Sequence, residues 1–114
     1  MAQFGAIMRS FGIRYGYYDP KDWKAARYCD PIVDTWGDMM NAVAAFAFAQ
    51  DDEGRNTAST KLLELSGKFN MMVEKGMVVH KGKFVAGANM TIADFVMASY
   101  IGNFLKNANN PLAP

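Results

Sequence analysis

The chain has 114 residues, of which 51% are hydrophobic and 20% charged, a composition typical of one globular domain that buries its own core. Its formal net charge of +1, with acids and bases interspersed, provides no basic surface for nucleic acid or for an anionic membrane. The single cysteine, Cys29, cannot form an internal disulfide, so we expect an intracellular, reducing compartment. The longest apolar run, residues 42–49, is far shorter than the roughly 20 residues that cross a bilayer, and no secretory signal precedes it. We therefore expect no membrane insertion.

The first expected helix covers residues 3–15. Its apolar side chains Ile7, Met8 and Phe11 fall at helical spacing, and Gly16 occupies the position of a C-terminal stop. A tyrosine-rich connector then leads to the second helix.

The second expected helix begins at Asp19-Pro20 and runs to about residue 50. Aspartate suits the N-cap, and proline suits the first helical position because its missing N–H would have no partner there. Pro31 is expected to bend or split this helix. The apolar residues repeat at intervals of three and four: Ile32, Val33, Trp36, Met39, Met40, Val43 and Phe46.

The third expected helix covers residues 57–75, after an acidic and glycine-containing loop at residues 51–56. Gly76 is its expected C-cap. Residues 77–80 are rich in β-branched side chains but too short to predict a strand. The helix carries an apolar stripe of Leu62, Leu65, Phe69 and Met72.

The last expected helix starts after Thr91 and runs to about residue 106. Thr91 suits the N-cap, and Asp94, three residues later, can accept a hydrogen bond from the backbone N–H of Thr91. Met90 and Phe95 stand where a hydrophobic staple would form. This segment therefore combines a capping box with a staple.

The sequence thus predicts an all-α fold, in which residues 107–114, rich in proline and asparagine, do not extend the last helix. It shows no metal-spaced cluster of cysteine and histidine and no glycine-rich phosphate loop, so no metal or cofactor is expected. Cys29 and His80 lack the local signature of a nucleophile and its base. We interpret them as a packed thiol and a surface imidazole.

Three segments resemble the glutathione transferase family. Residues 84–87 and 90–95 are similar to the signature that leads into the buried sixth helix of that family, residues 3–9 to the end of its thioredoxin-like domain, and residues 15–18 to its domain linker. The resemblance implies a glutathione-transferase C-terminal-like helical bundle, truncated at both ends. Residues 1–16 would be the last helix of a thioredoxin-like domain, and residues 17–114 the helical domain.

Three aspartates of the second helix, Asp30, Asp34 and Asp38, stand four residues apart and project from one face. From the residues alone this is a solvated acidic stripe. The resemblance implies more: Asp30 pairs with Arg9 across a dimer interface, and Asp38 reaches the glutathione bound by the partner subunit.

The resemblance also assigns Gln3 to the glutathione site and Phe48 to a hydrophobic substrate pocket. Phe48 is equally suited to the core. Phe4 departs from the family, because a serine hydroxyl that binds the glutamyl carboxylate is expected at this position. The catalytic group of the family lies upstream of the part that this chain resembles, so no catalytic residue is expected.

Two functions remain open at this point. In the first, the chain is a non-catalytic helical interaction module, either a homodimer or an accessory subunit of a larger assembly. In the second, it is a fragment of an active glutathione transferase, with glutathione as its substrate. We expect no autonomous activity and no nucleic-acid partner.

Overall fold

The computed structural model describes residues 3–81 and 83–106 of the chain. Within them every regular element is helical, which confirms the all-α prediction. The expectation for residues 107–114 lies outside the described residues. The elements in chain order are α1 (Gln3–Tyr15), α2 (Trp23–Ala47), α3 (Asp52–Val79), α4 (Ile92–Tyr100) and a closing π-helical turn, η1 (Ile101–Leu105).

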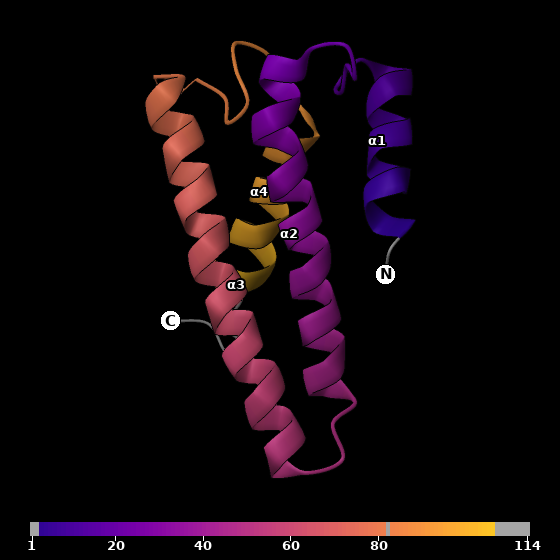
Figure 1. The fold of residues 1–114 in the computed structure, drawn as a ribbon, viewed down its shortest axis with the longest axis vertical. Coiled ribbons are helices and arrows are strands. Elements are labelled where there is room, and N and C mark those ends of the chain that lie inside the picture. The colour runs from indigo at the N-terminus through magenta and orange to yellow at the C-terminus, as the bar shows by residue number, and fades with distance from the viewer. Residues whose placement is uncertain (1–2, 82, 107–114) are drawn as a thin grey trace.

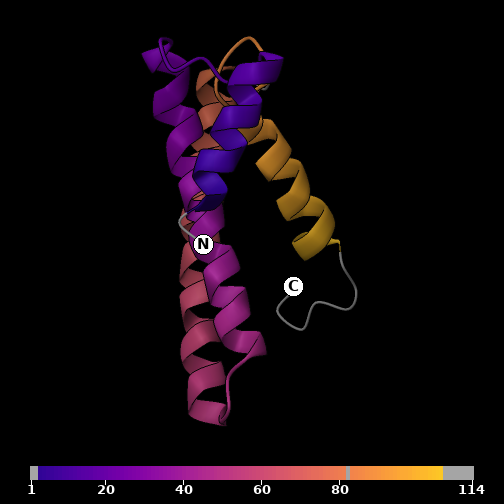
Figure 2. The same cartoon turned by 90° about the vertical axis from the view of Figure 1, so that its right-hand side faces the viewer.

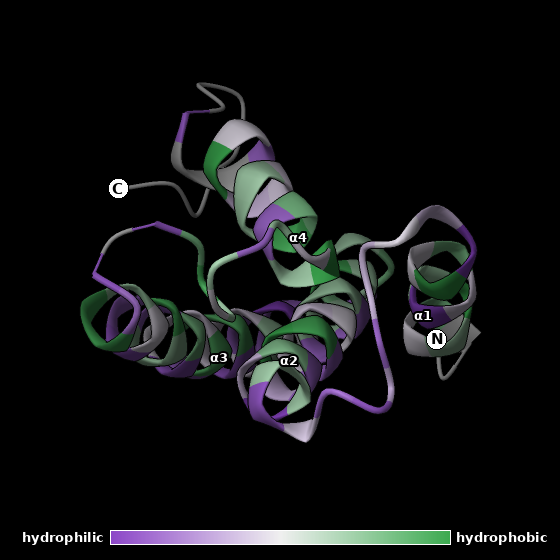
Figure 3. Cartoon of the chain, turned by 90° about the horizontal axis from the view of Figure 1, so that it is seen from above, coloured by the Kyte–Doolittle hydropathy of each residue, from purple (hydrophilic) through white to green (hydrophobic). Residues whose placement is uncertain are grey.

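The helices α2 and α3 form a long antiparallel hairpin, which sets the length of the molecule (Figure 1). α1 lies beside α2, and α4 crosses behind the hairpin (Figures 1 and 2). Seen from above, α3, α2 and α1 stand in a row, and α4 forms a second layer over α2 and α3 (Figure 3). Both α1 and α4 cover only the upper part of the hairpin in Figure 1.

The predicted bounds of α1 are confirmed, and Gly16 ends the helix with a positive φ of 84°. The predicted start of α2 is wrong. Asp22 is the N-cap and accepts a hydrogen bond from the N–H of Ala25 at 3.1 Å, whereas Asp19 caps the preceding turn through the N–H of Lys21. Both Asp19 and Asp22 are suited to an N-cap, and α2 begins after Asp22, which lies closer to the apolar pattern of the helix.

Pro31 does not split α2, which continues unbroken to Ala47. Proline removes one helical hydrogen bond. Because Pro31 lies on the exposed side of α2, water can bind the carbonyl group that is left free.

The predicted loop at residues 51–56 is mostly helix. Asp51 accepts a hydrogen bond from the N–H of Gly54 at 2.7 Å, and Asp52 and Glu53 place negative charge at the positive end of the α3 dipole. α3 also extends past Gly76, which is not the C-cap. A Cβ at Gly76 would lie 2.4 Å from the carbonyl oxygen of Val85. The absence of a side chain at Gly76 therefore allows the segment after α3 to pack closely against the helix.

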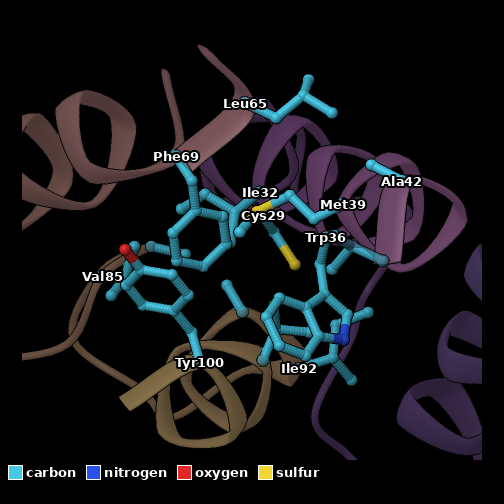
Figure 4. Close-up of a cluster of buried hydrophobic side chains, with 14 of the residues drawn as sticks. Cys29, Ile32, Trp36, Met39, Ala42, Leu65, Phe69, Val85, Ile92 and Tyr100 are labelled. Carbon is cyan, nitrogen blue, oxygen red and sulfur yellow. The ribbon is translucent and has the colours of Figure 1, made fainter. Parts of the chain in front are cut away.

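The core lies where α2, α3 and α4 meet (Figure 4). Trp36, Phe69 and Tyr100 each come from a different helix, and the rings of Phe69 and Tyr100 have their centroids 4.7 Å apart. Val85, from the segment before α4, closes the same cluster. Other large side chains that are fully buried in the described residues include Cys29, Ile32, Val33, Met39, Ile92 and Val96.

Candidate functional site

A network of polar side chains joins α1 to α2. The Nε of Arg9 donates to Asp30 at 3.0 Å, and its second terminal nitrogen donates to Asp34 at 2.9 Å. The Tyr18 hydroxyl donates to Asp30 at 2.9 Å. Burial acts to lower the pKa of Arg9, but its hydrogen bonds to both aspartates outweigh this and raise the pKa. The network holds the connector and α1 against one face of α2.

The resemblance implies the Arg9–Asp30 pair between two subunits, but the structure forms it within one chain, because α1 packs along α2. A role for these residues at a dimer interface stays a prediction. Sequence reasoning missed Asp34 and Tyr18 as partners, although the four-residue spacing of Asp30 and Asp34 was the available signal. It also missed Gly5, where a Cβ would lie 2.6 Å from the Arg9 guanidinium.

Asp38 borders a shallow pocket of about 380 Å³ between the start of α1 and the middle of α2. Phe4 lines the same pocket, and its ring lies 3.7 Å from the position of a Cβ on Gly37. Gln3 is the first residue of α1, and its side chain is not described. The structure thus brings the start of α1 and Asp38 to one pocket, whereas glutathione contacts from Gln3 and Asp38 stay predictions.

Phe48 lies at the C-cap of α2 and is 82% exposed. The alternative that it is a core aromatic is therefore wrong. α2 ends one residue before Phe48, and neither α1 nor α4 reaches this end of the hairpin (Figure 1). Its role in a substrate pocket stays a prediction.

Thr91 occupies the N-cap of α4 in the arrangement of a capping box, but the two halves of the box are unequal. The N–H of Thr91 donates to Asp94 at 2.8 Å. The Thr91 hydroxyl oxygen is buried and has no hydrogen bond of good geometry within the described residues. Asp94 also accepts from the N–H of Val85 at 3.1 Å, which the sequence did not predict.

The staple residues Met90 and Phe95 are both about two-fifths exposed. Phe95 packs edge-on against Tyr17 of the connector, with ring centroids 4.9 Å apart. This contact joins α4 to the connector after α1, as does the hydrogen bond from the N–H of Ile92 to the carbonyl of Tyr17. A staple between Met90 and Phe95 stays a prediction.

Cys29 and His80 do not form a nucleophile and base. Burial raises the pKa of the Cys29 thiol to about 11, although the Ala93 backbone and the Thr91 side chain lower it by smaller amounts. The Nδ1 of His80 lies 2.8 Å from the carbonyl oxygens of both Gly76 and Val85. Because both partners are acceptors, Nδ1 carries a hydrogen and donates to them. His80 therefore ties the end of α3 to the next segment.

A cavity of about 670 Å³ opens beside His80 at the upper end of the hairpin. Aromatic side chains from the connector and from the start of α2 line it. Charged side chains of both signs also line it, namely Asp19, Asp22, Lys24 and Arg27, so the cavity does not select a cationic or an anionic ligand.

No group of side chains in residues 3–81 and 83–106 is arranged to hold a metal ion. No helix in the same residues is long and apolar enough to span a membrane.

Comparison with models of known protein families gives a match. A family model described as "Glutathione S-transferase, C-terminal domain" matches residues 37–114, which is more than half of the chain. No curated protein and no solved structure matches the chain. The matched region runs from the middle of α2 through α3 and α4, which are the helices that build the core. The chain therefore belongs to the glutathione S-transferase C-terminal domain family.

Proposed function

We propose that this chain is a helical interaction module of the glutathione transferase family, without conjugating activity of its own. Phe4 carries the proposal. The serine that the resemblance leads us to expect there would donate a hydrogen bond to the glutamyl carboxylate of glutathione, whereas a phenyl ring provides no donor. The Phe4 ring also borders the pocket that contains Asp38, where it takes up space beside Gly37.

The ionisable groups favour the same conclusion. Conjugation requires a thiolate, so a transferase lowers the pKa of its thiol by means of a nearby donor or positive charge. Within the described residues, burial raises the pKa of Cys29. Burial and the hydrogen bond to Asp30 also raise the pKa of Tyr18, because its hydroxyl already donates to a carboxylate. Both groups are shifted away from the reactive form.

The proposal includes a protein partner, either a second copy or another subunit. The outward face of α1 supports a partner, because Ile7, Phe11 and Tyr15 recur at intervals of four and each is more than half exposed. In this proposal residues 1–16 are the tail of a thioredoxin-like domain and residues 17–114 the helical domain. α1 packs against both α2 and α4. This packing supports the assignment, because the tail of the first domain is expected to adjoin the helical domain.

The test is a conjugation assay with purified protein, glutathione and a chloronitrobenzene substrate. We expect conjugation at the uncatalysed rate. In a separate NMR titration we expect no chemical-shift change at Asp38 or Gly37 when glutathione is raised to 10 mM, which is roughly the dissociation constant of the weakest specific site. Catalysed conjugation by this chain would refute the proposal.

One observation favours the alternative of a transferase fragment. Asp38 is exposed beside the pocket and forms no ion pair with another described residue, so it is available to a ligand ammonium group. If this alternative is correct, Phe4→Ser creates glutathione binding, and the double variant Phe4→Ser, Asp38→Asn abolishes it.

A further inference from the structure

Three segments that are distant in sequence line the cavity beside His80. The connector, the first turns of α2 and the segment that leads into α4 meet at the upper end of the hairpin (Figure 1). The volume of the cavity, about 670 Å³, lies in the range of small-molecule sites. The cavity shares no lining residue with the pocket that contains Asp38. It is therefore a second candidate site, separate from the one that the resemblance implies.

The cavity is rich in aromatic side chains, which come from the connector and from α2. Tyr28 packs edge-on against the His80 ring, with centroids 4.7 Å apart, and Tyr17 packs in the same way against Phe95. These contacts hold two walls in place before a ligand binds, which reduces the entropy that binding costs. Trp23 differs, because it is 65% exposed and no described aromatic ring packs against it. Its flat face is available to an aromatic ligand.

The charged side chains around the cavity balance one another. Asp19 and Asp22 accept hydrogen bonds from backbone N–H groups of their own turns, at 2.9 Å and 3.1 Å. Lys24 and Arg27 each lie over an aromatic ring, with the charged group 5.9 Å and 5.6 Å from the ring centroid. The two negative and two positive charges cancel, and each already has a local partner. A net charge on the ligand therefore gains no specific contact, which favours a neutral ligand.

His80 adds one hydrogen-bond acceptor to these aromatic walls. Its Nδ1 donates to the carbonyl oxygens of Gly76 and Val85, so Nδ1 carries the hydrogen. In the neutral form of the ring Nε2 is then an acceptor, and no described residue donates to it. Contacts within the protein select this tautomer, so the acceptor is present before a ligand binds.

We propose that this cavity binds a neutral, planar aromatic molecule that donates one hydrogen bond to Nε2 of His80. Trp23 provides the stacking surface, and Tyr28 with His80 provides the fixed wall. Indole is a simple probe of this class, because it has a flat neutral ring and a single N–H donor. The proposal goes beyond the interaction function and does not depend on it.

The first experiment is an NMR titration of the full chain with indole and with 1-methylindole, which has the same ring system but no donor. We expect saturable chemical-shift changes at the backbone amides of residues 86–90, with a dissociation constant of about 1 mM for indole. 1-Methylindole is expected to bind about fivefold more weakly, as for the loss of one hydrogen bond. Absence of saturation up to about 10 mM indole, or equal affinity for the two probes, overturns the proposal.

The second experiment repeats both titrations on three variants. Trp23→Ala removes the exposed ring and is expected to weaken both probes by at least about fivefold. His80→Asn keeps a donor at the position of Nδ1 through its side-chain amide but lacks Nε2, so both probes are expected to bind alike. Phe11→Ala is the matched control, because Phe11 is also an exposed aromatic side chain but lies outside the cavity. Neither affinity should change in this variant.

The variants separate a specific site from general adhesion to aromatic surface. Circular dichroism establishes that all three are folded. Indole affinity that is unchanged in Trp23→Ala, or that falls equally in Phe11→Ala, overturns the proposal. A His80→Asn variant that prefers indole by the wild-type factor overturns the role of Nε2. If His80→Asn does not fold, Trp23→Ala and the comparison of the two probes still decide the outcome.

Discussion

The two ends of the α2–α3 hairpin are built from the same two helices but differ in what covers them. At the upper end α4 adds a second layer, and Trp36, Phe69 and Tyr100 meet in a sealed core. At the lower end small residues such as Ala42 and Ala58 line a groove between α2 and α3, and Phe48 is exposed. Apolar sequence alone therefore does not decide burial in this fold. The presence of a third helix does.

The upper end is also held by polar contacts that meet at Val85. Its carbonyl accepts from Nδ1 of His80, and its N–H donates to Asp94. Gly76 allows the same carbonyl to approach α3 closely. These contacts connect the end of α3 to the start of α4 through one buried residue. Within residues 3–81 and 83–106, nothing comparable joins α2 and α3 to a third element at the lower end.

The largest expected difference between the ends comes from removing one phenylalanine from each. Phe69→Ala empties a site that is 1% exposed, so we expect a loss of about 3 to 5 kcal/mol in the free energy of unfolding. Phe48→Ala removes an exposed ring, so we expect a change within about 0.5 kcal/mol. Urea denaturation followed by circular dichroism measures both. Equal losses at the two sites would show that the lower end is as tightly packed as the upper.

A second pair of variants tests the close approach at Gly76. Gly76→Ala forces a methyl group against the Val85 carbonyl, and we expect a loss of about 1 to 3 kcal/mol. Gly67→Ala is the matched control on the same helix. A Cβ there meets no atom within 4 Å, so alanine should stabilise α3 by about 1 kcal/mol through its helix propensity. Melting temperatures that move in the same direction for both variants would contradict the packing role of Gly76.

The sequence was sufficient for the elements that depend on local signals. The bounds of α1 and the start of α4 follow from Gly16 and Thr91, whose roles depend on their own backbone conformation and on neighbours close in sequence. The start of α2 was wrong because Asp19 and Asp22 carry the same local signal, and only the packed structure selects one.

The parts that the sequence did not reveal depend on contacts between distant residues. From its local sequence Gly76 is suited to a C-cap. Only the structure shows that a glycine is needed there because the Val85 carbonyl, from the segment after α3, lies against it. Arg9 pairs with Asp34 as well as with Asp30, and the Tyr18 hydroxyl donates to Asp30, because α1 folds back on α2 through the connector. The exposure of Phe48 likewise depends on where α1 and α4 stop, which no local pattern encodes.

The smallest expected effects distinguish the two residues of the α4 cap. Asp94→Ala leaves the N–H groups of Thr91 and Val85 without their acceptor, and we expect a loss of about 2 kcal/mol at the upper limit for a cap. Thr91→Ala removes a buried hydroxyl that has no hydrogen bond of good geometry in the described residues, so we expect less than about 1 kcal/mol. Chemical denaturation gives both values, and amide exchange at Val85 should accelerate only in Asp94→Ala. If Thr91→Ala costs as much as Asp94→Ala, the hydroxyl caps α4 after all, and the covered end of the hairpin depends on a local cap as much as on the contacts that meet at Val85.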